Sequence, residues 1–116
     1  MRFGTFCFGS IEINGVAYNH DIVIERCEVR KRRKKPSKKF RAEYGHTPLA
    51  GEEEIPWGCQ RLVIGTGAYG SLPVMKGVRF EAERRKVELR VLPTEQAIKV
   101  LKEGDEKTNA ILHVTC

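Results

Sequence analysis

Apolar and polar residues alternate near the start of the chain, in the stretch GSIEINGVAYNHDIVIE. Ile11 and Ile13 alternate with polar neighbours, which is the period expected of a half-buried strand. Asn14-Gly15 follows and is the preferred pair for a type I′ turn, because both central residues of that turn need positive φ. The pattern therefore predicts an N-terminal β-hairpin around this turn.

A second alternating stretch covers residues 21–25. Ile22 and Ile24 fall on one face of the predicted strand, and Val23 falls on the other face. We expect this strand to continue toward Val29, where a run of basic residues begins.

The next part of the chain predicts a loop followed by a short helix. Residues 36–48 contain two prolines and a glycine, which favour a loop. Thr47 and Pro48 suit the N-cap and the first position of a helix. That helix would carry the three glutamates at 52–54 and would end near Pro56.

The second half of the chain alternates between strand-like and helix-like segments. It predicts a buried strand over 61–65, a helix over about 73–85 capped by Ser71, a strand over 87–92, a helix over 95–102 capped by Thr94, and a last strand over 109–115. Because a helical crossover joins the first two of these strands, we expect them to be parallel. The whole pattern predicts a single α/β domain over 1–116.

Composition narrows the class of protein. Hydrophobic residues make up 41% of the chain and charged residues 31%, which is typical of a globular domain. No apolar run approaches the ~20 residues of a membrane helix, so we expect a cytoplasmic protein with no membrane partner. The four cysteines include no C-x-x-C pair, so the sequence predicts no metal site.

The net charge of +6 is concentrated in one segment. Residues 30–41 hold nine basic side chains and no acid, and the rest of the chain has 12 basic against 15 acidic residues. This basic loop region (30–48) could bind nucleic acid without sequence specificity, or a protein partner, or it could pair with the glutamates at 52–54. The candidate residues are Arg30, Lys31, Arg32, Arg33, Lys34, Lys35, Lys38 and Lys39.

The stretch LVIGTGAYGS contains the spacing G-x-G-x-x-G of dinucleotide-binding turns. Pro73 would fall in the second turn of a helix that began at the second glycine, where proline costs about 3 kcal/mol. The acidic residue expected after the second strand is also missing, because that position reads Leu92-Pro93-Thr94. We therefore expect no nicotinamide or flavin cofactor, and a tight glycine turn instead.

A small anion or a partner's carboxylate is a possible ligand of this turn. Ligands of open α/β sheets bind outside the carboxyl ends of the strands, where the glycine turn and the predicted helix at 95–102 would meet. Backbone N–H groups and a helix N-terminus suit an anion. The candidate residues are Gly65, Thr66, Gly67, Thr94, Glu95 and Gln96. The alternative is that Thr94 only caps its own helix.

Four stretches in order resemble one known family. FGSIEINGVAYNHDIVI, LVIGTG, VELRVLPTEQAIKVL and AILHVTC are similar to the adipogenesis-associated Mth-domain proteins, which include a mitochondrial assembly factor for the NADH–ubiquinone oxidoreductase complex. The resemblance implies a three-layer α/β domain with a central mixed sheet, here with an N-terminal hairpin and a βαβαβ second half. It implies no established enzymatic activity and no cofactor.

These observations favour a non-catalytic accessory or assembly protein that works through a protein partner or through self-association. His46 lies in a predicted loop and His113 in a predicted strand, and nothing in the sequence orders either against a nucleophile. The sequence therefore assigns no catalytic residue. Binding of a small anion at the glycine turn is the alternative function, and non-specific nucleic-acid binding is the third.

Overall fold

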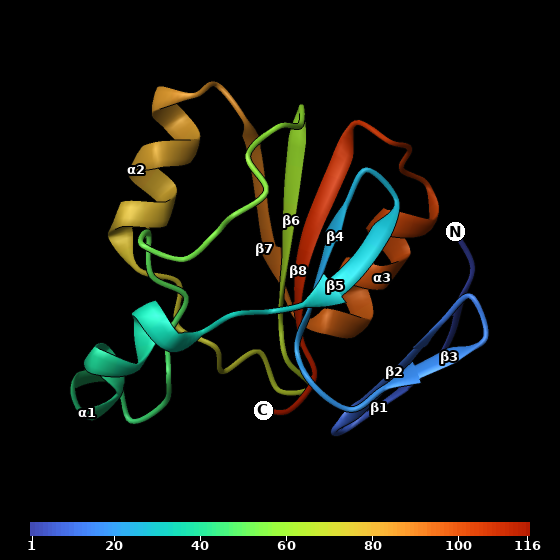
Figure 1. The fold of residues 1–116 in the computed structure, drawn as a ribbon, viewed down its shortest axis with the longest axis horizontal. Helices are drawn as coiled ribbons and strands as arrows, with labels where there is room; N and C mark the ends of the chain where they lie inside the picture. The colour runs from blue at the N-terminus through green and yellow to red at the C-terminus, as the bar shows by residue number, and fades with distance from the viewer.

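A five-stranded mixed sheet forms the middle layer of the protein, in the order β5-β4-β8-β6-β7 (Figure 1). The computed structural model describes residues 1–116. The strands are β1 (Phe3–Cys7), β2 (Ser10–Ile13), β3 (Val16–Tyr18), β4 (Ile22–Glu25), β5 (Glu28–Lys31), β6 (Arg61–Thr66), β7 (Glu88–Leu92) and β8 (Thr108–His113). The helices are the 3₁₀ helix η1 (Lys35–Phe40), α1 (Arg41–Tyr44), α2 (Lys76–Arg84) and α3 (Thr94–Lys102).

Each face of the central sheet has its own hydrophobic core. On one face, α3 and the antiparallel sheet β1-β2-β3 cover buried side chains that include Ile22 and Ile24. On the other face, α2 and the segment 48–57 cover a second core that includes Val23. The alternation predicted for residues 21–25 is confirmed, and so is the three-layer α/β fold.

The second half of the chain is the predicted βαβαβ unit. β6 lies between β7 and β8 and is parallel to both. The two crossovers therefore run in opposite directions across the sheet, and two right-handed crossovers then place their helices on opposite faces. Figure 1 shows this arrangement, with α2 on one side of the sheet and α3 on the other. None of the helices is long and apolar enough to cross a membrane.

The predicted hairpin turn at Asn14-Gly15 is confirmed, but it leads into β3, which was not predicted, and the strand predicted at 21–25 lies in the central sheet and is shorter than expected. β2 and β3 pair around Asn14 and Gly15, which have φ values of 53° and 80°. β4 does not reach Val29: the chain reverses at Arg26 and Cys27, which have φ values of 51° and 64°, and returns as β5. The prediction was wrong because this turn contains none of the residues that favour positive φ. Strand β1 was not predicted.

The short helix expected after Thr47 is absent, and the helices lie earlier, at η1 and α1. Leu49 is fully buried and forms an isolated parallel bridge with Val74. Tertiary packing therefore holds segment 48–57 in a non-helical path with a turn and bend at 51–53 and overrides its local helix signals.

Both predicted helix caps are also wrong. α2 begins at Lys76 after Met75, so Ser71 does not cap it. Pro93 occupies the N-cap position of α3, and Thr94 is the first helical residue, with its hydroxyl bonded elsewhere.

Candidate functional site: a cationic crevice

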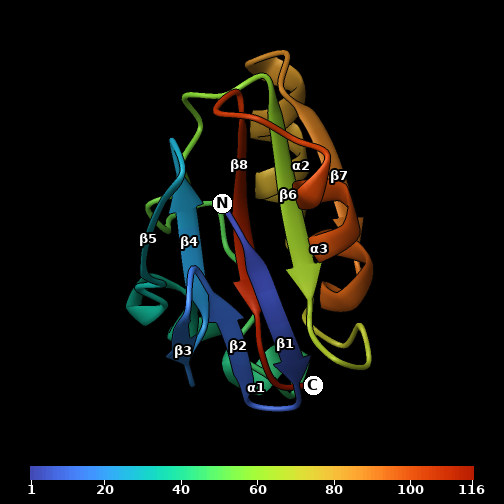
Figure 2. The ribbon, with the colours of Figure 1, turned by 90° about the vertical axis from the view of Figure 1, so that its right-hand side faces the viewer.

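The largest crevice of the protein, about 550 Å³, opens at the carboxyl ends of the parallel strands. Figure 2 shows the arrows of β6 and β8 pointing to the end of the molecule where α1 and the last residues lie. The crevice is lined by Arg32, Lys34, Lys38, Arg41, Gly45, His46, Thr47, His113, Thr115 and Cys116. The lining contains four basic residues and two histidines, but no acidic residue.

One wall of the crevice comes from the basic segment that follows β5. η1 carries Lys38, and α1 carries Arg41. These two cations and Lys34 make no ion pair with any carboxylate, although neighbouring basic residues do. Three unpaired positive charges therefore face the same space.

Arg32 lies at the base of the crevice with its side chain only 1% exposed. Its guanidinium donates two hydrogen bonds to Glu53, Nε to Oε1 at 2.9 Å and Nη2 to Oε2 at 2.7 Å. It also donates to Asp21 Oδ2 at 2.8 Å and to the carbonyl of Pro48 at 2.9 Å. Burial alone would lower the pKa of Arg32, but the hydrogen bonds and charges of Glu53 and Asp21 outweigh burial and raise it.

Ser37 ties η1 to the same group of charges. Its hydroxyl donates to Oε2 of Glu53 and accepts a hydrogen bond from the backbone N–H of Ala50 at 3.1 Å. Arg32, Glu53 and Ser37 therefore fix the basic segment on the core, and the cations of the crevice wall are positioned by buried contacts.

A line of three polar side chains, Asp21, His113 and Thr115, reaches the crevice from the end of β8 and the residue before β4. Asp21 comes directly before β4, which pairs antiparallel with β8, so its carboxylate lies beside His113. His113 Nδ1 donates to Asp21 Oδ2 at 2.8 Å, and His113 Nε2 lies 3.1 Å from the hydroxyl of Thr115. The second oxygen of Asp21 accepts the backbone N–H of Val114 at 3.0 Å.

The carboxyl group of Asp21 is held in its charged form. Burial raises its pKa, but the hydrogen bond and charge of His113, the N–H of Val114 and the charge of Arg32 outweigh burial and lower the pKa to about 2. Asp21 therefore places a fixed carboxylate next to His113, whereas no carboxylate lines the crevice itself.

A thiol and a second imidazole meet at the edge of the crevice. Cys116 Sγ lies 3.8 Å from Nδ1 of His46. His46 follows Gly45, whose φ of 75° ends α1 in the left-handed region.

The glycine turn and the start of α3 lie beside this crevice but do not line it. The N–H of Gly67 donates to the hydroxyl of Thr94 at 2.8 Å, and that hydroxyl donates to the carbonyl of His113 at 2.6 Å. Glu95 and Gln96 are exposed on α3. The structure thus brings the glycine turn to Thr94 as expected, and anion binding there stays a prediction.

The basic run does not form one continuous charged surface. Arg30 pairs with Glu25 and Lys39 with Glu52, at 3.6 and 3.1 Å. Arg32 is buried, so its charge is not presented to solvent. The alternative of pairing with the glutamates at 52–54 accounts for part of the run, and nucleic-acid binding by the remaining residues stays a prediction.

Sequence reasoning missed Asp21 and Thr115, and it named Glu53 only as one of three glutamates that could pair with the basic run. They belong to segments far apart along the chain, and only the pairing of β4 with β8 and the path of segment 48–57 bring them to Arg32 and His113. An aspartate directly before a strand of buried residues was the one available signal.

Solved structures of other proteins share the fold. The chain is 32% identical to the conserved hypothetical protein PH1505 from Pyrococcus horikoshii, with a TM-score of 0.85 over 100% of both chains. It is also 32% identical to MT938, with a TM-score of 0.73 over 98% of this chain and 97% of that one. A Mth938-like domain from Bordetella pertussis has a TM-score of 0.59 at 20% identity over 97% of this chain and 84% of that one.

No protein-family model and no curated protein matches the chain. The resemblance inferred from the four sequence stretches agrees with these solved structures, which match the chain over nearly all of its length. With about one third of its residues identical to PH1505 along its entire length, the chain belongs to the Mth938-like domain family.

Proposed function

We propose that the cationic crevice binds a small molecule through a phosphate or carboxylate group. One observation carries this proposal: Lys34, Lys38 and Arg41 face a common space of about 550 Å³ without an acidic partner in its lining. Like charges gathered in a crevice repel each other, and an anion relieves that repulsion.

The chemistry of the cations suits an oxyanion. The guanidinium of Arg41 presents paired N–H donors that match two oxygens of one phosphate or carboxylate group. The ammonium groups of Lys34 and Lys38 add charge without a fixed geometry. The buried bonds of Arg32 and Ser37 hold the backbone of this wall in place, so fewer degrees of freedom are lost on binding.

Calorimetric titration with inorganic phosphate tests this proposal. We expect Lys38→Gln and Arg41→Gln each to weaken phosphate binding about tenfold, which corresponds to about 1.4 kcal/mol. Lys99→Gln removes the same charge from the exposed surface of α3 and serves as the matched control. Equal affinities in all three variants, or no binding to the unmodified protein, would contradict the proposal.

An accessory role through self-association is a second candidate function, favoured by an exposed aromatic pair. Phe8 and Tyr69 are 56% and 75% exposed, and their ring centroids lie 5.9 Å apart. Sedimentation velocity compares the unmodified protein with Phe8→Ser. A dimer that dissociates in this variant supports the role, and a monomer at every concentration of the unmodified protein excludes self-association through this pair.

A further inference from the structure

We propose that Asp21, His113 and Thr115 form a catalytic relay that hydrolyses esters of negatively charged acids bound in the crevice. The inference rests on the proposed function for the binding of the substrate's charged group, and it adds a reaction. Carboxylate, imidazole and hydroxyl follow one another at 2.8 and 3.1 Å, which is the order used to activate a hydroxyl nucleophile.

The reacting groups are accessible. His113 and Thr115 both line the crevice, whereas Asp21 does not. The two residues stand two positions apart on an extended segment, so their side chains project to the same side of the backbone. A substrate in the crevice therefore meets the hydroxyl and the imidazole together.

The position of the imidazole is fixed from behind. The Asp21 carboxylate accepts from Nδ1 of His113, which leaves the lone pair of Nε2 directed at the Thr115 hydroxyl. Asp21 is in turn oriented by the N–H of Val114 and by Arg32, so neither of its oxygens is free to turn away. Asp21 is thus a positioning residue, and His113 and Thr115 are the catalytic residues.

The reaction proceeds in two balanced steps. Thr115 Oγ1 bonds to the ester carbonyl carbon as its proton passes to His113 Nε2, and the resulting oxyanion collapses with cleavage of the ester C–O bond. The departing alcohol takes the proton from His113. Water then attacks the acylated Thr115 with His113 again as the base, which releases the acid and restores the hydroxyl.

The cations of the crevice determine which ester binds. Lys38 and Arg41 line the same crevice as His113 and Thr115 and would hold a carboxylate at the far end of the acyl chain. The same ester without the charge lacks this contact and forms fewer productive complexes. We therefore expect a preference for charged over neutral acyl groups.

The test measures hydrolysis of the mono-p-nitrophenyl ester of adipic acid, whose carboxylate is too far from the ester to expel the nitrophenolate through a five-membered anhydride, with p-nitrophenyl acetate as the neutral comparison. We expect Thr115→Val and His113→Gln to lower kcat/KM for the charged ester at least about 100-fold. Thr115→Ser keeps a hydroxyl and retains activity. Thr5→Val makes the same change at an exposed threonine of β1, outside the crevice, and leaves the rate unchanged.

Two further measurements decide what a loss of activity means. Melting temperatures show whether each variant is folded, and mass spectrometry of the quenched reaction locates the acyl group of the adipate ester, which we expect on Thr115. An unchanged rate in folded Thr115→Val, or the acyl group on a lysine or on Cys116, would overturn the relay. If phosphate binds but no ester is cleaved, the relay fails while the proposed function stands. If the ester is cleaved but phosphate does not bind and Arg41→Gln leaves KM unchanged, the proposed function fails while the relay stands.

Discussion

Asp21 connects two strands and the side chains of Arg32 and His113 through its two carboxylate oxygens. One oxygen accepts from Val114, directly after β8, and the other lies between the guanidinium of Arg32 and the imidazole of His113. A carboxylate with this many donors stabilises the folded state only while it is ionised.

We expect this stabilisation to disappear at low pH. The folded-state pKa of Asp21 is about 2, below the ordinary value of 3.8, so its contribution is fully present above the ordinary value and is lost as the pH falls through the folded-state value. The difference corresponds to about 2 kcal/mol. Urea unfolding at several pH values should show the unmodified protein gaining this much over Asp21→Asn between about pH 2 and pH 5. A constant difference between the two proteins would contradict the prediction.

Glu53 pairs with the charge of Arg32 at a buried position that water does not solvate. Because both side chains are buried, Glu53→Gln leaves Arg32 with Asp21 as its one remaining carboxylate partner, and we expect it to lower the free energy of unfolding by about 3 kcal/mol. Glu54→Gln makes the same change at the next, exposed position and should stay within about 0.5 kcal/mol of the unmodified protein. Similar losses in both variants, measured by chemical denaturation, would show that burial of the pair does not matter.

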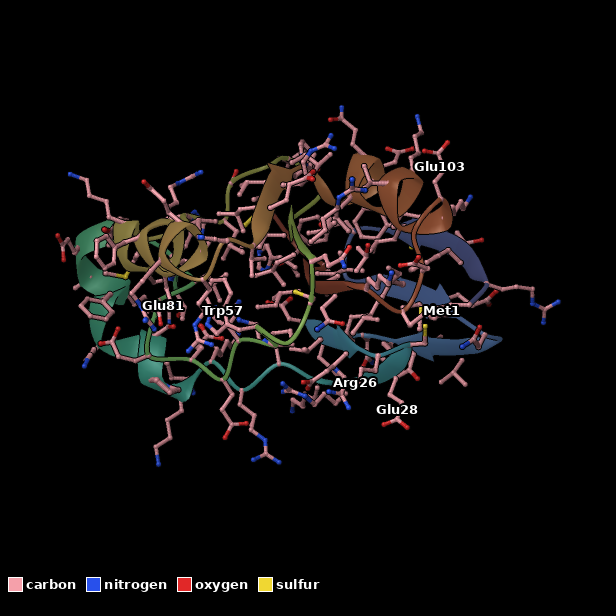
Figure 3. All side chains as sticks on the ribbon, turned by 90° about the horizontal axis from the view of Figure 1, so that it is seen from above. Met1, Arg26, Glu28, Trp57, Glu81 and Glu103 are labelled. Carbon is pink, nitrogen blue, oxygen red and sulfur yellow. The ribbon has the colours of Figure 1, made fainter.

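At the scale of single elements, the β4–β5 turn has the positive φ values of a type I′ hairpin turn but lacks the asparagine and glycine that usually occupy such a turn. Arg26 and Cys27 both have positive φ, which costs L-residues other than asparagine and aspartate roughly 1 kcal/mol each. Figure 3 views the molecule from the end opposite the crevice, where Arg26 and Glu28 lie at this turn. The turn is therefore a strained element remote from the candidate site.

Replacing this pair by Asn-Gly should stabilise the protein. We expect the double variant Arg26→Asn/Cys27→Gly to gain about 1 kcal/mol in the free energy of unfolding, with phosphate binding unchanged. Asn14 and Gly15 already occupy the β2–β3 turn. Gly15→Ala should therefore destabilise the protein, because alanine is strained at the φ of 80° found there. A loss of stability in the double variant would mean that contacts of the original side chains outweigh the backbone strain.

At the scale of the whole molecule, the sequence was informative about layers and uninformative about contacts between distant segments. Apolar alternation in 21–25 and the strand–helix order of the second half predicted the central sheet and its parallel strands, because these patterns are local. The crevice opens at the carboxyl ends of the strands, where the sequence predicted a ligand, but none of the six residues predicted to bind that ligand lines it.

The particular residues of the crevice could not be predicted in the same way. The basic side chains of 30–41 look alike in the sequence. In the structure, Arg32 is buried against Glu53 and Asp21, whereas Lys38 pairs with no carboxylate. Thr94 shows the same limit, since its hydroxyl bonds to Gly67 and His113 instead of capping its helix.

Gly67 shows how closely the chain packs at the end of the sheet. It has a φ of 103°, and a Cβ there would lie 2.5 Å from the carbonyl carbon of Cys116. We expect Gly67→Ala to destabilise by about 3 kcal/mol or more, because it adds overlap to backbone strain. Gly9→Ala, where φ is 88° and nothing lies within 4 Å of a Cβ, should cost about 1 kcal/mol. Equal melting temperatures for the two variants would contradict this explanation.

The close approach at Gly67 also gives the glycine spacing a different meaning. In a dinucleotide-binding turn, the second glycine lets the backbone come near a pyrophosphate. Here the same missing side chain admits the protein's own peptide: the N–H of Ala68 donates to the carbonyl of Thr115, and that of Ser71 to the carbonyl of Cys116. Residues 115 and 116 thus occupy the backbone donors that a bound ligand would use at this turn. A ligand would have to displace these two residues in order to bind there. Any such displacement would carry Thr115 away from His113, so occupation of the turn and assembly of the relay are mutually exclusive states of one segment.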